Sequence, residues 1–519
     1  MNRHDAIDQL KKSTRLWDMI IIGGGATGLG TAVDAASRGY RTLLLEQKDF
    51  AQGTSSRSTK LVHGGVRYLQ QGNISLVLEA LRERGLLLKN APHLVHNQAF
   101  IVPNYEWWEG PFYGIGLKMY DALAGKLGFG PSKMLSREET IEQIPTVETA
   151  GLRGGVIYHD GQFDDARLAV NLAQTLCDLG GCGINYMRVT GLLKSKNYVN
   201  GVLVRDEESG EEYELNARVV INATGVFADS VRKMDDPSCT PILVPSQGVH
   251  LVLDRSFLPG KTAIMVPHTD DGRVLFAVPW HNRVIVGTTD TPVNDISLEP
   301  KALPDEINFL LTHAARYLTK DPSKDDVLSV FAGLRPLVKS HETSDTASIS
   351  RDHSLIVSSS GLLTICGGKW TTYRKMAEDT VKEAELLAGF EERPVKSAHL
   401  RLHGWLKNSD PSDYLSVYGS DAFAIRALSV SKPKLGEPLH PDLPYTRAEI
   451  VWAVHREMAR TVEDVLARRT RALLLNARAS MEIAEEVAGI MDDELEKGKK
   501  WRKQQVEDFL KLAENYIIR

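Results

Sequence analysis

The stretch from residue 17 to residue 46 limits the folds open to this chain more than any other. The apolar run MIII is followed at once by three glycines, which is typical of a strand buried in a parallel sheet. Gly23, Gly25 and Gly28 fit the spacing G-x-G-x-x-G, and a second apolar run ends at Glu46, about 20 residues later. These spacings predict a strand, a glycine turn, a helix and a second strand, which together form a dinucleotide-binding unit.

Each glycine of this motif has a steric role. Gly23 makes a tight turn, Gly25 lets the backbone approach a pyrophosphate, and Gly28 lets the helix pack close to the strand. The phosphates would lie at the helix N-terminus, where free N–H groups favour negative charge. A carboxylate at Glu46 accepts hydrogen bonds from a ribose diol and repels a 2′-phosphate, so the motif favours FAD or NAD over NADP.

Length and composition narrow the class of protein. A chain of 519 residues is too long for one core, and a prior of about 150 residues per domain predicts two to four domains. The net charge of −5 gives no reason to expect nucleic acid, and no run of about 18 apolar residues predicts a transmembrane helix. The cysteines show no metal-ligand spacing, so we expect reduced thiols in a cytoplasmic compartment and no metal. They are Cys177, Cys182, Cys239 and Cys366.

A polar stretch after Glu46 offers hydrogen-bond donors of small size, suited to a pyrophosphate or a ring edge. Its hydroxyl residues are Thr54, Ser55, Ser56, Ser58 and Thr59. His63 and Gly64 follow, where the backbone can approach a flat group, and then Arg67 and Tyr68. The alternative interpretation is a polar loop with a solvated arginine. The next apolar pattern predicts a helix from about Ile74 to Asn90.

Two later strand ends predict further contacts with the same cofactor. Ala223, Thr224 and Gly225 close an apolar strand with a turn of small residues, as expected where the edge of a sheet meets a ligand. A second strand ends at Gly368, before a helix predicted from about Thr371 to Leu386. Two helix N-termini directed at one cofactor, one at the pyrophosphate and one at the ring, favour a flavoprotein over a nicotinamide enzyme.

These motifs carry a resemblance to a known family. GGGATGLG followed by TSSRSTKLVHGGVRYL resembles the FAD-dependent glycerol-3-phosphate dehydrogenases of the D-amino-acid oxidase superfamily. The first motif is common to many flavoproteins, and the second is much narrower. The resemblance extends over most of the chain, through DGQFDDARL at 160–168, NATGVFAD at 222–229, GTTDT at 287–291, GLRPL at 333–337, GGKWTTYRKMAE at 367–378 and EMARTVEDVLARRTRALLLN at 457–476.

The resemblance implies an α/β fold with three parts. These are a Rossmann-like FAD-binding domain, an inserted substrate domain built on an antiparallel sheet, and an all-helical C-terminal cap. Short apolar runs that alternate with turns between residues 240 and 330 also indicate the antiparallel sheet. We expect the FAD-binding domain at 16–91, 151–235 and 331–392, the substrate domain at 92–150 and 236–330, and the cap at 393–519.

The implied reaction is the oxidation of glycerol 3-phosphate to dihydroxyacetone phosphate, with hydride transfer to FAD. A phosphate near charge −2 calls for guanidinium and ammonium groups. The substrate-binding residues implied by the resemblance are Arg67, Tyr68, Arg335, Lys369 and Thr371. Thr372 is the alternative to Thr371, because the motif holds two threonines. The predicted cofactor-binding residues are Gly23, Gly25, Gly28, Glu46, Thr54, Ser55, Ser56, His63, Gly64, Ala223, Thr224, Gly225, Gly368, Lys369 and Thr372.

The general base must reach the proton of the substrate hydroxyl. By resemblance, His250 in SQGVHLVL is the first choice, and Arg335 and Lys369 complete the predicted catalytic set. His63 is the rival, although its neighbouring glycines suggest contact with the cofactor. A deprotonated Lys369 is a third option, because nearby arginines would lower the pKa of its ammonium group.

The resemblance also implies an electron acceptor. The family's dehydrogenases pass electrons to a membrane quinone, whereas related glycerol-3-phosphate oxidases use oxygen and make hydrogen peroxide. Those oxidases carry an inserted segment, and the compact spacing here favours the dehydrogenase branch. We therefore expect a quinone and a lipid surface as partners, a cytoplasmic location at the inner face of the cell membrane, and a homodimer as one option for assembly.

Two stretches are candidates for the membrane contact. One holds Trp107, Trp108, Phe112 and Tyr113 with Lys118 and Lys126, and the other is the basic run from 497 to 503. Each has a plain alternative, namely domain packing for the first and a solvated helix face for the second. Two rival functions also remain, an amine or amino-acid oxidase and a flavin-bearing redox sensor without turnover.

Overall fold

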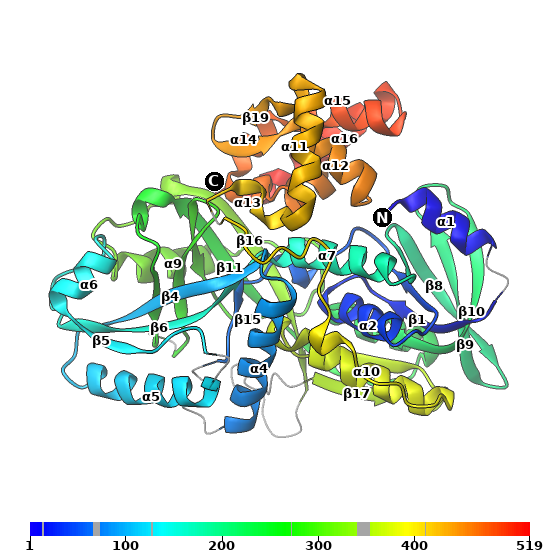
Figure 1. Ribbon diagram of the computed structural model, residues 1–519, viewed down its shortest axis with the longest axis horizontal. Coiled ribbons are helices and arrows are strands. Elements are labelled where there is room, and N and C mark those ends of the chain that lie inside the picture. The colour runs from blue at the N-terminus through cyan, green and yellow to red at the C-terminus, as the bar shows by residue number, and fades with distance from the viewer. Residues whose placement is uncertain are drawn as a thin grey trace.

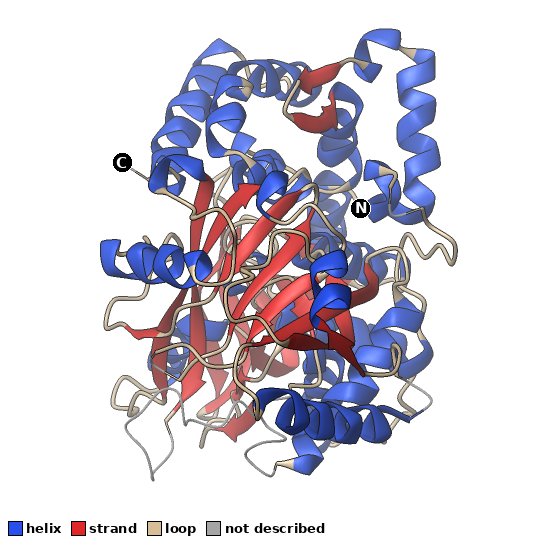
Figure 2. Ribbon diagram, turned by 90° about the vertical axis from the view of Figure 1, so that its left-hand side faces the viewer, coloured by secondary structure: helices blue, strands red, loops and turns tan. Residues whose placement is uncertain are grey.

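The computed structural model describes residues 1–12, 15–65, 73–125, 128–270, 272–339, 353–410 and 412–518. Two sheets stand next to each other, and a group of C-terminal helices covers them at one end (Figure 1). Figure 2 shows the same helices beyond the ends of the strands. The predicted α/β class with three parts is confirmed.

The first sheet contains the glycine motif. Its order is β17, β18, β10, β1, β2 and β7, and the inner strands from β18 to β7 run parallel. The apolar strands β1 and β2 are buried on both faces, as parallel strands covered by helices must be. The strands are β1 (Trp17–Ile22), β2 (Thr42–Leu45), β7 (Cys182–Ile184), β8 (Met187–Ser195), β9 (Tyr198–Asp206), β10 (Glu212–Asn222), β17 (His353–Val357) and β18 (Leu363–Gly367).

Helices cover one face of this sheet. On one face α2 (Ala26–Ser37) packs between α7 (Asp165–Asp178) and α10 (Tyr373–Ala388). The other side carries an antiparallel extension, in which β8 pairs with β9 and β9 with β10. Helix α4 covers Ile74–Asn90, as predicted from the sequence. The other α-helices outside the cap, within the described residues, are α1 (Arg3–Lys12), α5 (Glu109–Ala124), α6 (Arg137–Gln143), α8 (Ala228–Asp235) and α9 (Pro304–Ala315).

The second sheet is mainly antiparallel. Its order is β15, β11, β14, β13, β12, β4, β6 and β3, with β16 paired to β11 and β5 to β6. Strands β6 and β16 lie in this sheet, although the predicted boundaries at 150 and 330 assign β6 and most of β16 to the FAD-binding domain. We propose boundaries after these strands instead. The strands are β3 (Leu61–Val62), β4 (Val95–Asn104), β5 (Lys133–Ser136), β6 (Gly154–Phe163), β11 (Leu243–Asp254), β12 (Ala263–Val266), β13 (Leu275–Trp280), β14 (Arg283–Gly287), β15 (Thr291–Pro292) and β16 (Val327–Val338).

The C-terminal cap packs on one face of the second sheet. Val252, Trp280 and Phe331 of the sheet share a core with cap residues such as Val465 and Leu473. The cap is helical apart from a short hairpin of β19 (Pro438–His440) and β20 (Leu443–Thr446). Its helices are α11 (Ala422–Ser431), α12 (Arg447–Arg456), a π-helix at Asp464–Arg469, α13 (Ala472–Leu475), α14 (Ala477–Glu482), α15 (Ala484–Leu495) and α16 (Lys499–Ala513).

His403 joins the cap segment to the first domain and gives the fold a pH dependence. Its Nδ1 lies 2.6 Å from Asp178 at the end of α7, and its Nε2 lies 3.0 Å from Asp421 before α11. Burial disfavours the charged ring, but the two carboxylates outweigh burial and raise the pKa of His403 to about 9. The stability that this contact adds is therefore complete below the unfolded pKa of about 6.5 and is lost as pH rises through about 9.

We expect His403→Gln to lower the free energy of unfolding by about 1 to 2 kcal/mol at pH 6, after discounting for partial exposure. At pH 10 the loss should fall below about 0.5 kcal/mol, because the wild-type ring is then neutral. Urea unfolding of both proteins at the two pH values measures the difference. An equal loss at pH 6 and pH 10 would mean that the charge of the ring contributes nothing.

Candidate active site

The glycine turn brings three segments of the first domain together. Gly23 has φ of +110°, and a Cβ there would crowd the carbonyl oxygen of Ala223 at the end of β10. A Cβ at Gly28 would overlap the carbonyl oxygen of Gly23, so α2 packs against β1 more closely than any side chain permits. The amide of Ala26 donates to the Ser55 hydroxyl at 2.9 Å. The turn therefore forms a cradle of closely packed backbone at the N-terminus of α2.

Glu46 closes one side of this cradle. Its carboxylate accepts hydrogen bonds from the amides of Gly24 at 2.6 Å and Lys48 at 2.9 Å. Burial raises the pKa of Glu46, while the two amides favour its charged form. The carboxylate is thus fixed at the end of β2, beside the glycine turn.

A second turn meets the polar stretch from across the domain. Gly367 and Gly368 both have positive φ, and the chain then enters a 3-10 turn at Trp370–Thr372 and helix α10. The Trp370 indole donates to the carbonyl of Ser55 at 2.9 Å, and the His63 amide donates to the Thr371 hydroxyl at 3.2 Å. The two predicted cofactor segments therefore lie against each other, and a second helix N-terminus follows directly.

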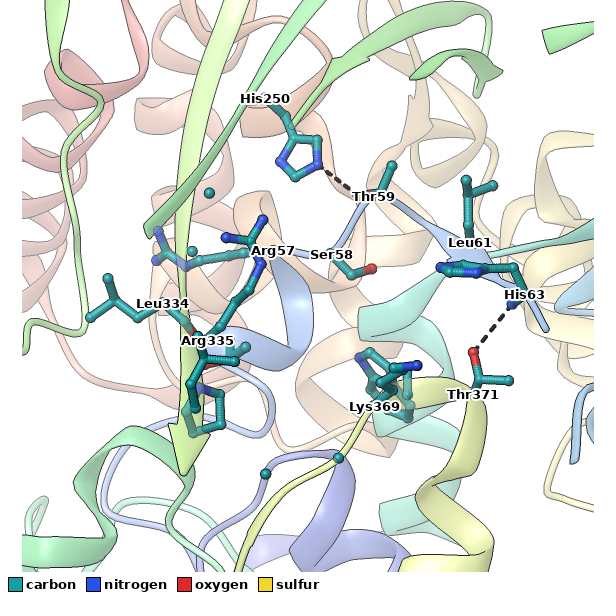
Figure 3. Close-up of a pocket in the computed structure, with 18 of the residues that line it drawn as sticks. Arg57, Ser58, Thr59, Leu61, His63, His250, Leu334, Arg335, Lys369 and Thr371 are labelled. Atoms are coloured by element: carbon teal, nitrogen blue, oxygen red, sulfur yellow. Dashed lines mark hydrogen bonds between the residues drawn. The ribbon is translucent and has the colours of Figure 1, made fainter. Parts of the chain in front are cut away.

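A cavity of about 210 Å³ lies where these segments face the second sheet (Figure 3). It brings together seven of the predicted site residues, namely Thr54, His63, His250, Arg335, Gly368, Lys369 and Thr371. Thr371 lines this cavity, whereas the hydroxyl of Thr372 donates to the carbonyl of Lys369. The predicted residues Arg67 and Tyr68 lie outside the described residues. The other predicted cofactor residues belong to the turns and strand ends of the first domain or to the polar stretch. They are Gly23, Gly25, Gly28, Glu46, Ser55, Ser56, Gly64, Ala223, Thr224 and Gly225.

Strand alternation places the basic and imidazole groups on one face of the second sheet. His250 on β11 pairs with Phe331 on β16, and Ser246 pairs with Arg335, four residues further along. Because side chains alternate with a period of two, His250 and Arg335 point to the same side. Gly248 lies between them, and a Cβ there would crowd the Arg335 guanidinium. A glycine at this position leaves room for both side chains.

The Arg335 guanidinium is held in a fixed orientation. It donates to the carbonyl of Thr289 at 2.8 Å, to the Thr288 hydroxyl at 3.2 Å and to the Asp290 carboxylate at 3.0 Å. Its side chain retains 20% exposure. The cation is therefore positioned in advance, and its orientation costs little entropy when an anion binds.

His250 lies in an apolar and cationic setting. Its ring stacks on Phe331, with centroids 4.8 Å apart and planes 13° apart. Burial, followed by the cations Lys60 and Arg335, holds the pKa of His250 well below its usual value. The imidazole is therefore neutral at pH 7 and is able to accept a proton. A dianionic ligand beside Arg335 would raise this pKa.

The sequence interpretation missed several residues around the cavity. Arg57 lines it and is held by Glu299 and by the carbonyl of Ala332. Lys60 is fully buried, its ammonium lies 2.7 Å from Asp165, and burial lowers its pKa to about 7. The sequence gives no local signal for the buried position of Lys60, because its partner Asp165 lies more than 100 residues away along the chain. Within the described ranges, no group of His, Cys, Asp and Glu side chains is arranged to hold a metal ion.

Two family models match this chain. One, FAD dependent oxidoreductase, matches residues 18–374, and the other, C-terminal domain of alpha-glycerophosphate oxidase, matches residues 361–505. The mitochondrial glycerol-3-phosphate dehydrogenase of Mus musculus is 40% identical over 542 residues, covering 98% of this chain and 74% of the relative. The chain is a member of the FAD-dependent glycerol-3-phosphate dehydrogenase family.

Solved structures agree with this membership. The glycerol-3-phosphate dehydrogenase from Bacillus halodurans, solved with FAD, has a TM-score of 0.81 and 29% identity, and the match covers 99% of this chain and 98% of that one. The L-alpha-glycerophosphate oxidase from Mycoplasma pneumoniae shares the fold, with a TM-score of 0.58, 17% identity and coverage of 75% and 98%. The predicted cofactor, FAD, is confirmed. The backbone cradle at Gly23 and Gly28 and the second turn at Gly367 and Gly368 fit a ligand with a pyrophosphate and a flat ring.

Proposed function

We propose that this enzyme oxidises glycerol 3-phosphate at carbon 2 to dihydroxyacetone phosphate. The observation that carries the proposal is the cavity in which Arg335 and neutral His250 share one sheet face, with Lys369 on the wall from the FAD-binding domain. Cations separated from a proton acceptor match a substrate with a phosphate at one end and a reacting hydroxyl near its centre. The names of the relatives support the same substrate.

The proposed roles follow from these positions. Arg335 binds the phosphate through its fixed guanidinium, and Lys369 adds a second positive charge from the opposite wall, helped by Arg67 and Tyr68 of the family motif. Thr371 orients the His63 backbone beside the substrate. His250 takes up the hydroxyl proton as the general base. FAD, when bound, accepts the hydride of carbon 2.

The same proposal assigns the cofactor contacts. The glycine cradle and Glu46 would hold the adenosine and pyrophosphate half of FAD. Ala223, Thr224 and Gly225 would support it from the end of β10. The segment from Thr54 to Gly64 and the turn from Gly368 to Thr372 would hold the flavin half, because both line or border the cavity.

For the electron acceptor we propose a membrane quinone, with oxygen as the alternative. The dehydrogenase names of the relatives at about 40% identity favour the quinone, although the family model that matches residues 361–505 is named for an oxidase. The solved oxidase from Mycoplasma pneumoniae, at 17% identity, shares the fold alone. Among the described residues, no helix has the length and apolar character needed to cross a bilayer. Contact with a quinone would therefore occur at the membrane surface.

Anaerobic reduction tests substrate and acceptor together. Glycerol 3-phosphate should bleach the bound flavin, and a soluble quinone should then restore its colour much faster than oxygen does. Fast reoxidation by oxygen with release of hydrogen peroxide would favour the oxidase. A flavin that glycerol 3-phosphate does not bleach would contradict the proposed substrate.

Replacing His250 with Asn tests the general base. We expect reduction at saturating glycerol 3-phosphate to slow by about 100-fold or more, because general-base catalysis contributes roughly that factor. The concentration for half-reduction should change little, since Arg335 and Lys369 stay in place. Rapid-mixing absorbance measures both quantities. Equal reduction rates in the two proteins would exclude His250 and favour His63 or Lys369.

Helix α5 is the proposed membrane contact. Trp108, Phe112, Ile115 and Met119 recur at helical spacing and are all exposed, Ile115 by 69%. Such a row on one helix face is typical of an interfacial helix. Tyr113 lies on the buried side, contrary to the sequence interpretation, and Lys126 lies outside the described residues. The basic run near the C-terminus is less suited, because Lys497, Arg502 and Lys503 pair with glutamates.

We expect the double substitution Phe112→Glu with Ile115→Glu to abolish most binding to vesicles that contain anionic lipid. Each apolar side chain moved into lipid contributes about 1.5 to 3 kcal/mol, so the bound fraction should fall at least about tenfold. Sedimentation with vesicles measures it. Phe423→Glu on α11 removes an exposed phenylalanine from the cap and should leave binding unchanged. A similar loss in both variants would argue against α5.

A further inference from the structure

Thr59 connects the polar stretch to the proposed base. Its hydroxyl oxygen lies 2.9 Å from Nε2 of His250, and both residues line the cavity (Figure 3). We infer that Thr59 is a catalytic residue that relays the substrate's hydroxyl proton to His250. This inference rests on the function proposed above and adds a residue to it.

The His250 ring has little freedom to find another partner. Phe331 covers one face of the ring, and Gly287 lies so close that a Cβ there would overlap ring atom Cδ2. Nδ1 is buried and has no hydrogen-bond partner among the described residues. Nε2 is therefore the ring nitrogen in contact with a polar group, and that group is the Thr59 hydroxyl.

A hydroxyl is suited to this position because it donates and accepts at once. When Thr59 donates to Nε2, its oxygen keeps lone pairs for a ligand in the cavity. An aliphatic side chain of the same shape would remove the hydroxyl contact with Nε2 and so block this transfer.

The transfer balances in atoms and electrons. The O–H bond of the substrate and that of Thr59 break, while a new Oγ1–H bond and an Nε2–H bond form. The electron pair of the substrate's O–H bond becomes the second bond of the new carbonyl, as the hydride of carbon 2 passes to FAD. Thr59 ends unchanged, and His250 ends as an imidazolium that loses its proton between turnovers.

The charges around the ring agree with a neutral acceptor. The ammonium group of Lys60 lies 5.1 Å from the centre of the Phe331 ring and is paired with Asp165. Arg335 lies on the same face of the second sheet as His250. Asp290 pairs with Arg335 rather than with the imidazole. Lys60 and Arg335 both lower the pKa of His250, and each is paired with its own carboxylate. They disfavour the imidazolium until the substrate's negative charge arrives.

Thr59→Val and Thr59→Ser separate the hydroxyl from the shape of the side chain. With saturating glycerol 3-phosphate, Thr59→Val should reduce flavin about 100-fold more slowly than the wild type, and Thr59→Ser should stay within about fivefold. In the wild type the rate should fall at low pH as His250 becomes protonated, and the rate of Thr59→Val should lose this dependence. Thr146→Val is the matched control, because it removes one hydroxyl bond, to the Phe257 carbonyl at 2.8 Å, outside the cavity. FAD content and melting temperature should match between Thr59→Val and this control.

A double-mutant cycle with His250→Asn completes the test. If the two residues form one relay, the double variant should be no slower than the slower single variant. Multiplied defects, a serine variant as slow as the valine variant, or a valine variant as fast as the wild type would each overturn the relay while the wild type still oxidises glycerol 3-phosphate. A wild-type flavin that this substrate does not reduce would overturn the proposed function and the relay with it.

Discussion

Replacing Arg335 with alanine should raise the concentration of glycerol 3-phosphate needed for half-reduction of the flavin by about 30- to 1,000-fold. Loss of a charge-assisted contact to a desolvated phosphate costs on the order of 2 to 4 kcal/mol. The guanidinium is fixed by Thr288, Thr289 and Asp290 before any anion binds, so the variant also loses this advance positioning. FAD should stay bound, because the guanidinium donates to Thr288, Thr289 and Asp290 of the substrate domain and the glycine cradle belongs to the FAD-binding domain.

Two further variants make this result specific. Arg335→Lys keeps the charge but loses the planar fork, and its effect should fall between those of the wild type and the alanine variant. Arg283→Ala removes an arginine of β14 that donates to the carbonyls of Asn282 and Asp442 outside the cavity, and it should not alter half-reduction. An unchanged value for Arg335→Ala would remove this residue from the substrate site. Anaerobic titration of the flavin spectrum measures all three variants.

Replacing Asp49 with alanine should lower the free energy of unfolding by about 3 to 5 kcal/mol and weaken FAD binding. Asp49 follows Glu46 and is fully buried, and its carboxylate pairs with Arg468 at 2.5 Å and Arg469 at 2.7 Å of the cap. Breaking one side of a buried pair leaves charge without compensation. The same cap segment reaches the carbonyl of Ser56 through Arg471 at 2.9 Å, so it anchors the stretch proposed to contact the flavin.

Thermal unfolding and FAD release on dilution measure these two effects. Asp270→Ala is the control, because both side chains of its ion pair with Arg316 are exposed and such a pair contributes little to stability. A loss for Asp49→Ala as small as that of the control would mean that the cap does not hold this loop. A large loss of stability with unchanged FAD affinity would mean that the ion pairs of Asp49 with Arg468 and Arg469 serve folding alone.

Local physics made the elements of the first domain predictable. The β1–α2–β2 unit and helix α4 follow from apolar periodicity and from glycines that only a tight turn requires, and both lie where the sequence indicates. The helix after Gly368 was also expected, although its first turn is 3-10 and α10 begins at Tyr373. Domain boundaries were less predictable, because β6 and β16 are apolar strands that suit either sheet and only their pairing partners decide between them.

The residues of the candidate site were predictable from motifs, but their contacts with one another were not. His250, Arg335 and Lys369 were named from motifs, and the cavity that they line together was not visible in the order of the chain. Thr59 is one of several small hydroxyl residues in this stretch, and the sequence does not indicate which of them contacts the proposed base. Its contact with His250 joins residues that are 191 positions apart, and no local pattern encodes such a contact.

The sequence by itself determined the cofactor class and the family. A nucleotide is bound through backbone groups, and the glycines, helix start and acid that arrange them lie within one stretch of 30 residues, from 17 to 46. Only the tertiary structure decided which side chains share the cavity, which threonine faces His250, and that the cap arginines hold the loop of Asp49. Those facts depend on strand register and on buried ion pairs between distant segments, whose partners exist only after the chain has folded.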